Sequence, residues 1–183
     1  MPLSQEPRSA IVFLVGMPGC GKSTVGKALA GRLQFTFLDL DFLIEQREGL
    51  SVAQLFEQRG QAFFREAEAA ALRSVTAAQG GVVLATGGGA PCFHGNMTYM
   101  VESGVAVYLK VSPQELAARF TAHDLQVRPL LRDKTPEELL QYLSHTLAQR
   151  EPFYRQALLE IVVNERTVEE VTAVLQRQIM PFL

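Results

Sequence analysis

The segment "GMPGCGKST", Gly16–Thr24, directly follows the apolar run "AIVFLV" (residues 10–15) and leads into a helix-favouring stretch that begins at Val25. Four of its residues match the phosphate-loop pattern G-x-x-x-x-G-K-[ST]: Gly16, Gly21, Lys22 and Ser23. The pattern requires a strand before it and a helix after it, and the flanking residues predict both. We therefore expect backbone N–H groups and the positive end of the following helix to hold the phosphates of a nucleotide.

The remaining residues of this loop are expected to contact the nucleotide as well: Met17, Pro18, Gly19, Cys20 and Thr24. Lys22 is expected to neutralise charge toward the γ-phosphate, and the Ser23 hydroxyl to bind Mg²⁺. The sequence contains neither an N-K-x-D nor a D-x-x-G string, which argues against a regulatory GTPase.

Bulk composition favours one soluble domain. The chain has 183 residues and a formal net charge of −2, which argues against nucleic acid or an anionic membrane as the main partner. No apolar run approaches the roughly 20 residues of a membrane-spanning helix, and "MPLSQEPRS" lacks the apolar core of a secretory signal. We expect a cytoplasmic protein. Its two cysteines provide neither a disulfide framework nor metal-ligand spacing.

Five short apolar runs alternate with helical stretches, which predicts an α/β fold with a parallel sheet covered on both faces. The predicted strands are residues 10–15, 35–40, 81–86, 105–111 and 158–163. Four capping boxes mark helix starts: Ser51/Gln54, Ser112/Glu115, Thr135/Glu138 and Thr167/Glu170. They leave residues 121–134 as a connection between two helices, which is either a mobile lid or an ordinary solvated loop.

Asp39 and Asp41 are predicted to end the second strand. Side chains two apart on a strand share a side, so both carboxylates are expected to face the phosphate loop. One can order hydrated Mg²⁺ while the other accepts a hydrogen bond from an attacking hydroxyl. The alternative is a solvated turn and helix cap.

Three arginines suggest that the phosphate acceptor is itself an anion, because a guanidinium matches a carboxylate bidentately. Arg65 and Glu68 are three apart on one helical face, Arg128 precedes a proline, and Arg150 is expected near a helix end at Glu151-Pro152. Gly87–Gly89 follow the third strand and permit close approach of a ligand or form a plain tight turn.

The segments "GMPGCGKST", "LDLD", "FFREAE", "ATGGGA", "RPLL" and "QREPFY", in this order, resemble the shikimate kinase family over residues 10 to about 179. The resemblance implies one domain with a P-loop NTPase fold like that of nucleoside monophosphate kinases: a three-layer sandwich with a five-stranded parallel sheet in the order 2-3-1-4-5. It also implies a shikimate-binding region at about residues 41–79 and a lid at about 121–134. The implied activity is transfer of the ATP γ-phosphate to the 3-hydroxyl of shikimate by a monomer, in chorismate and aromatic amino-acid biosynthesis.

Site residues follow from the same resemblance. Asp41 is similar to the aspartate that binds the attacking hydroxyl, and Asp39 to the one that holds Mg²⁺ through water. Substrate-binding positions are implied for the arginines that grip the carboxylate and for the glycines at the ring hydroxyls: Arg65, Arg150, Gly87, Gly88 and Gly89. Nucleotide-binding positions are implied for three further arginines: Arg119, Arg128 and Arg166. Arg128 also resembles the catalytic lid arginine, and Glu68 the residue that orients Arg65.

Two features depart from the family pattern. The interval from Arg119 to Arg128 is about two residues longer than usual, and Val168 stands where a proline is often found. Three rival functions stay open: a gluconate kinase of the same fold, a nucleoside monophosphate kinase, and a nucleotide-binding module without activity.

Overall fold

The computed structural model describes residues 10–77, 80–121, 131 and 134–183. The predicted lid, including Arg128, lies almost entirely outside these residues. Within the described ranges no helix is long and apolar enough to cross a membrane.

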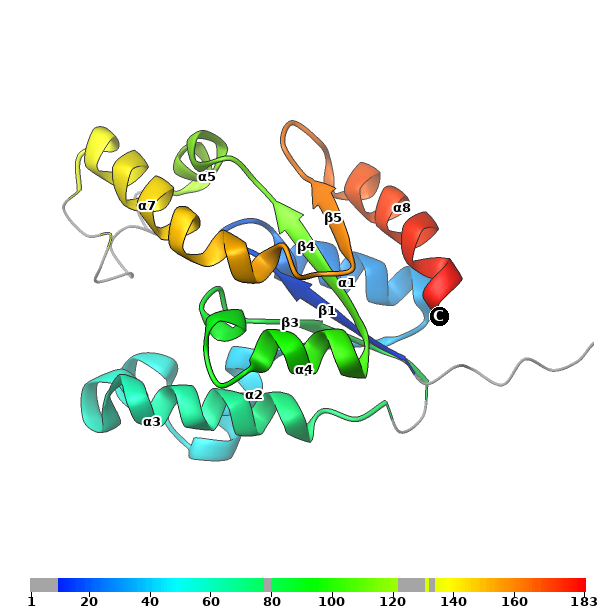
Figure 1. Cartoon of the computed structure of the whole chain (residues 1–183), viewed down its shortest axis with the longest axis horizontal. Helices are drawn as coiled ribbons and strands as arrows, with labels where there is room; N and C mark the ends of the chain where they lie inside the picture. Colours follow the sequence, from blue (N-terminus) through cyan, green and yellow to red (C-terminus); the bar gives the residue numbers. More distant parts are fainter. Residues whose placement is uncertain (1–9, 78–79, 122–130, 132–133) are drawn as a thin grey trace, which may run out of the picture.

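A five-stranded parallel sheet in the order β2-β3-β1-β4-β5 forms the centre of the molecule, which confirms the expected fold (Figure 1). Its strands are β1 (Ile11–Val15), β2 (Thr36–Asp39), β3 (Val82–Ala85), β4 (Val105–Lys110) and β5 (Leu159–Val162). All five residues of β1, the middle strand, are buried. This explains why its sequence is a continuous apolar run rather than an alternating one.

Helices cover both faces of the sheet, with α1 packed on α8 on one side and α4 and α7 on the other (Figure 1). The pair formed by α2 and α3 lies beyond the β2 edge. The helices are α1 (Lys22–Leu33), α2 (Leu40–Glu48), α3 (Val52–Ser74), α4 (Asn96–Ser103), α5 (Pro113–Arg119), α7 (Pro136–Tyr154) and α8 (Val168–Ile179), with short 3₁₀ turns η1 (Ala90–Cys92) and η2 (Met180–Phe182).

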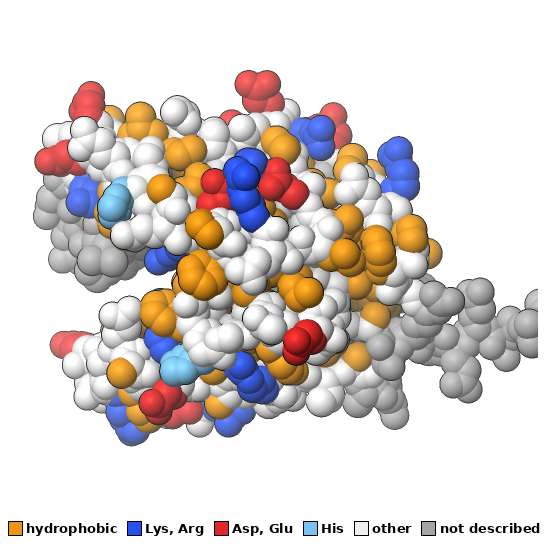
Figure 2. Space-filling view, viewed as in Figure 1, with side chains coloured by type: hydrophobic (Ala, Val, Ile, Leu, Met, Phe, Trp, Pro, Cys, Tyr) orange, Lys and Arg blue, Asp and Glu red, His pale blue; other side chains and the backbone are white. Residues whose placement is uncertain are grey.

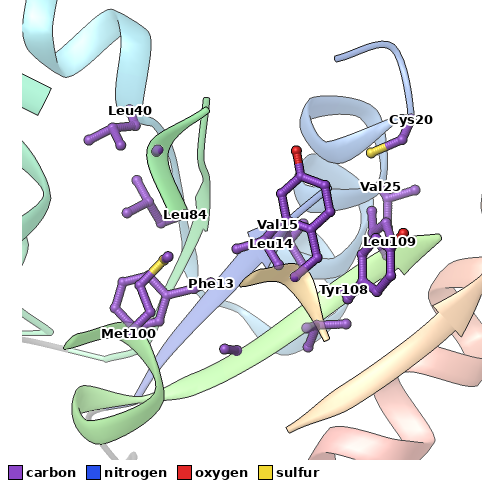
Figure 3. Packing of buried hydrophobic residues seen from close by; sticks show 14 of the residues in the cluster. Phe13, Leu14, Val15, Cys20, Val25, Leu40, Leu84, Met100, Tyr108 and Leu109 are labelled. Carbon is purple, nitrogen blue, oxygen red and sulfur yellow. The ribbon is translucent and has the colours of Figure 1, made fainter. Parts of the chain in front are cut away.

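The core is continuous from the β2 edge to the phosphate loop. Figure 3 shows side chains of β1, β3 and β4 packing together, and Cys20 at the end of this cluster. Leu14, Leu84 and Leu109 are each fully buried. The loop between β1 and α1 is therefore held in place by side chains that pack in the core, including that of Cys20.

Three of the four expected capping boxes are reciprocal, at Ser51, Thr135 and Thr167. The fourth prediction was wrong in part: the Ser112 hydroxyl accepts from the Glu115 N–H, but Glu115 does not return the bond. The Ser112 N–H donates to Asn164 instead, and the Glu115 carboxylate pairs with Arg119.

Two local predictions were also wrong. β2 ends at Asp39, and Asp41 lies in the first turn of α2, so the two carboxylates are not strand neighbours two apart. The helix that carries Arg150 does not break at Pro152 but runs to Tyr154. Proline is costly inside a helix because it lacks an N–H and crowds the preceding turn. Here only two residues follow it, and burial of Tyr154 holds that last turn against the core.

Candidate active site

The phosphate loop, residues 16–24, joins the end of β1 to the start of α1. Gly16 adopts φ +145°, and a Cβ there would lie 2.6 Å from the Leu109 carbonyl oxygen, so only glycine lets the loop pass this close to β4. Gly21 caps α1 in a left-handed conformation. The N-terminus of α1 therefore points its unpaired N–H groups into this loop, where they can bind phosphate oxygens.

Lys22 is nearly buried beneath the loop. Its ammonium donates to the Gly16 and Met17 carbonyl oxygens at 2.8 Å each and lies 3.7 Å from the Cys20 sulfur. An ammonium has three N–H donors, so Lys22 must give up at least one of these three contacts to bind a phosphate oxygen.

Asp39 connects the phosphate loop to α2. One carboxylate oxygen accepts from the Ser23 hydroxyl at 2.9 Å, and the other accepts from the Asp41 N–H at 3.1 Å as the helix cap. Asp39 is thus both a cap and a neighbour of the phosphate loop. Ser23 and Asp39 present a hydroxyl and a carboxylate side by side, which are oxygen ligands that Mg²⁺ accepts together with water and phosphate oxygens.

Asp41 lies at the junction of the phosphate loop and the glycine loop, Gly87–Gly89. An added Cβ on Gly87 would lie 3.2 Å from an Asp41 carboxylate oxygen and 3.1 Å from a Glu68 oxygen. Burial raises the pKa of Asp41, the charge of Asp39 raises it further, and Lys22 opposes both. A carboxylate with a raised pKa is a better proton acceptor near neutral pH.

Arg65, on α3, is held from three sides beside the glycine loop. Its guanidinium pairs with Glu68 at 2.7 Å and lies over the rings of Phe93 at 4.3 Å and Phe64 at 5.2 Å. A Cβ on Gly89 would meet the guanidinium at 2.6 Å. Arg65 therefore presents a fixed positive group against the glycine loop.

Arg150 comes to the same region from α7. Burial raises the pKa of Glu68, whereas the charges of Arg65 and, more weakly, Arg150 lower it. Burial also raises the pKa of the Cys92 thiol, which follows the glycine loop, and the charges of Arg150 and Arg65 lower it. Two arginines distant in sequence thus both act electrostatically on one buried carboxylate, which is consistent with a site for an anionic acceptor.

A cavity of about 310 Å³ opens beside the phosphate loop on the α8 side. Its lining includes Cys20, Thr24, Arg119, Arg166 and Val168, and its size suits the base of a nucleotide. Arg119 is held there by Glu115 at 2.9 Å and by the Cys20 carbonyl oxygen at 3.3 Å. Of the expected nucleotide-binding arginines, two line this cavity, while Arg128 lies outside the described residues.

The surface is hollowed between the part that carries α7 and the part that carries α3 (Figure 2). The acceptor-side residues come from both parts, Arg65 from α3 and Arg150 from α7. Together with the glycine loop and Asp41 they surround a region next to the phosphate loop. This arrangement can hold a hydroxylated anion close to a nucleotide.

Sequence reasoning missed Phe93 and the use of Glu115 to hold Arg119. It also assigned no role to Tyr154. In the structure its hydroxyl donates to the Gly88 carbonyl oxygen. Helical spacing from Arg150 was the available signal, but the partner in the glycine loop is 66 residues away.

Comparison with known proteins gives one consistent family. A sequence profile of the shikimate kinase family matches residues 18–180. A shikimate kinase of Bacteroides fragilis is 47% identical over 146 residues, with 80% of each chain covered.

Solved structures agree. The shikimate kinase structure from Bacteroides thetaiotaomicron has a TM-score of 0.82 at 38% identity and covers 93% of this chain and 98% of its own. The shikimate kinase from Acinetobacter baumannii in complex with shikimate has a TM-score of 0.82 at 33% identity, with 96% of each chain covered.

Proposed function

The chain belongs to the shikimate kinase family, and we propose that it transfers the γ-phosphate of ATP to the 3-hydroxyl of shikimate. The product is shikimate 3-phosphate, an intermediate of chorismate and aromatic amino-acid biosynthesis. One observation carries the proposal: the glycine loop has the Asp41 carboxylate at Gly87 and the Arg65 guanidinium, paired with Glu68, at Gly89. A hydroxyl acceptor and an anionic group are the two features of shikimate that this pairing matches.

In the proposed reaction Arg65 and Arg150 bind the carboxylate of shikimate, and Gly87–Gly89 let the ring hydroxyls approach the backbone. Asp41 accepts the hydrogen bond of the 3-hydroxyl. The hydroxyl oxygen forms a bond to the γ-phosphorus, the bond to the β–γ bridging oxygen breaks, and the hydroxyl proton passes to Asp41. Burial favours this last step because it raises the pKa of Asp41.

Lys22, the loop N–H groups and Arg128 are proposed to offset the charge that develops on the phosphates. Arg119 and Arg166 are proposed to bind the base. Ser23 and, through water, Asp39 would hold Mg²⁺, which when bound neutralises phosphate charge and orients the γ-phosphate. The Ser23–Asp39 contact at 2.9 Å supports this assignment because it places two oxygen ligands together.

ADP release from Mg²⁺-ATP tests the function, with shikimate, gluconate and nucleoside monophosphates offered separately. We expect turnover that depends on shikimate alone. Gluconate-dependent turnover would identify the rival kinase of the same fold. ATP binding without any acceptor-dependent turnover would indicate a nucleotide-binding module and refute the acceptor assignment.

We also propose, on the resemblance, that the enzyme acts as a monomer in the cytoplasm. Size-exclusion chromatography with light scattering tests the first statement, with a mass near 20.2 kDa expected. Fractionation of the source cells tests the second.

A further inference from the structure

Tyr154 contacts both loops that must meet for the proposed reaction. It is fully buried near the end of α7. Its hydroxyl donates to the Gly88 carbonyl oxygen at 2.5 Å and lies 3.8 Å from the Met17 sulfur. One side chain thus contacts the acceptor-side glycine loop and the phosphate loop, and it shares a helix with Arg150.

The two loops also touch directly. A Cβ on Gly88 would lie 2.6 Å from Pro18 Cδ and 3.1 Å from the Pro18 nitrogen. No side chain fits at Gly88, so the separation of the loops is set by contact between the Gly88 backbone and the Pro18 ring. Because Tyr154 contacts both Met17 and the Gly88 carbonyl, movement of the glycine loop away from the phosphate loop would break one of these two contacts.

The hydroxyl is suited to hold position and not to exchange protons. Burial raises the pKa of Tyr154 well above its ordinary value, while the charge of Arg150 opposes the shift. Tyr154 therefore stays protonated and remains a donor over the whole range in which the enzyme would work.

We propose that Tyr154 is a positioning residue for phosphoryl transfer, which holds the Gly88 carbonyl against the phosphate loop and fixes the acceptor loop relative to ATP. This inference rests on the proposed function. Phosphoryl transfer is catalysed mainly by positioning and charge stabilisation, and a misplacement of about 1 Å can cost about 10²-fold in rate. A buried hydrogen bond between the two binding loops is therefore expected to act on kcat.

The chain offers a matched control for removal of this hydroxyl. The Tyr108 ring packs against the Tyr154 ring at 5.2 Å, and its buried hydroxyl has no hydrogen-bond partner among the described residues. Tyr154→Phe and Tyr108→Phe thus make the same chemical change in one aromatic cluster. Only the first removes a bond to the glycine loop.

We expect Tyr154→Phe to lower kcat with shikimate by about tenfold or more. The Kd of a fluorescent ATP analogue should stay within about twofold of wild type, because the loop N–H groups and Lys22 are retained. Tyr108→Phe should match wild type in both. Rates are expressed per ATP-binding site, since a merely structural role would reduce the number of sites and leave kcat per site unchanged. An unchanged kcat per site in Tyr154→Phe would overturn the inference.

Amide hydrogen exchange of the segment 86–90, without acceptor, tests the same contact independently of substrate identity. Faster exchange in Tyr154→Phe but not in Tyr108→Phe supports the inference, and equal exchange in all three proteins overturns it. If wild type transfers no phosphate to shikimate while the exchange difference is present, the proposed function fails and the loop contact stands.

Discussion

Replacement of Arg65 by methionine should separate its effect on stability from its proposed role in acceptor binding. The Glu68 side chain is 1% exposed and the Arg65 side chain 12%, and their closest atoms are 2.7 Å apart. Removal of one partner from such a pair leaves an uncompensated buried charge. We expect Arg65→Met to lower the free energy of unfolding by about 3–5 kcal/mol.

The double variant Arg65→Met/Glu68→Leu should regain most of that stability. Both new side chains are apolar and position 65 lies against Phe64 and Phe93, and such replacements of a buried pair are often neutral. We expect its free energy of unfolding to lie within about 1 kcal/mol of wild type. Acceptor binding should not return, because the guanidinium is still missing.

The loss in acceptor binding follows from the two charge-assisted hydrogen bonds of a bidentate guanidinium. Each contributes about 1.5–3 kcal/mol, and about 1.4 kcal/mol corresponds to a factor of ten. The KM for shikimate should therefore rise by about 10²-fold or more in both the single and the double variant. Urea unfolding gives the free energies, and steady-state kinetics of ADP release gives KM and kcat.

The stability loss in Arg65→Met should depend on pH with a definite sign. Burial already raises the pKa of Glu68 above 4.5, and loss of the Arg65 charge raises it further. The folded state then binds a proton more tightly than the unfolded state, so the loss is present above the folded pKa and vanishes as pH falls below 4.5. Equal free energies of unfolding of the single and double variants at pH 7 would refute the stability argument. A wild-type KM in the double variant would refute the role of Arg65 in acceptor binding.

Three further variants address the proposed catalytic carboxylate, Asp41, and the contact between the two loops. Asp41→Asn should lower turnover by roughly 10²–10⁴-fold and leave the affinity for ATP unchanged. It should also raise the melting temperature at pH 7, because burial disfavours the ionised carboxylate. Near-normal turnover would exclude Asp41 as the proton acceptor. Glu45→Gln removes one of the negative charges that raise the pKa of Asp41. The acid limb of the pH profile of kcat/KM should therefore move to lower pH. An acid limb at the wild-type pH would show that the Glu45 charge has no effect on Asp41. Gly88→Ala should abolish most turnover, because its Cβ would lie 2.6 Å from Pro18. The control Gly31→Ala, whose Cβ would meet nothing within 4 Å, should match wild type. Equal activities of the two variants would contradict the close contact between the loops.

Local patterns in the sequence were sufficient to predict the phosphate loop, the strand order through family resemblance, and three reciprocal helix caps. The phosphate loop and the caps depend on residues that are neighbours in the chain or on a motif with fixed spacing, whereas the strand order followed only from the family resemblance. The Arg65–Glu68 pair belongs to the same class, because three residues along a helix bring two side chains together.

Predictions went wrong where a tertiary partner competed with a local one. The capping box at Ser112 is incomplete because Asn164 and Arg119, both outside the box, bind its groups. The strand pattern was extended to Asp41, but Asp39 caps α2 while it also binds Ser23. A local pattern indicates which bonds are possible and not which of two partners is nearer in the fold.

The sequence by itself thus predicted the kind of chemistry: a phosphate loop, two carboxylates near it, and arginines that suggest an anionic acceptor. The tertiary structure alone decided how these groups face one another. Tyr154 binds Gly88, Pro18 touches the same glycine, and Arg150 acts on Glu68 from another helix. These contacts join residues that are tens of positions apart, and their geometry depends on how α3 and α7 pack around the sheet, which no local pattern encodes.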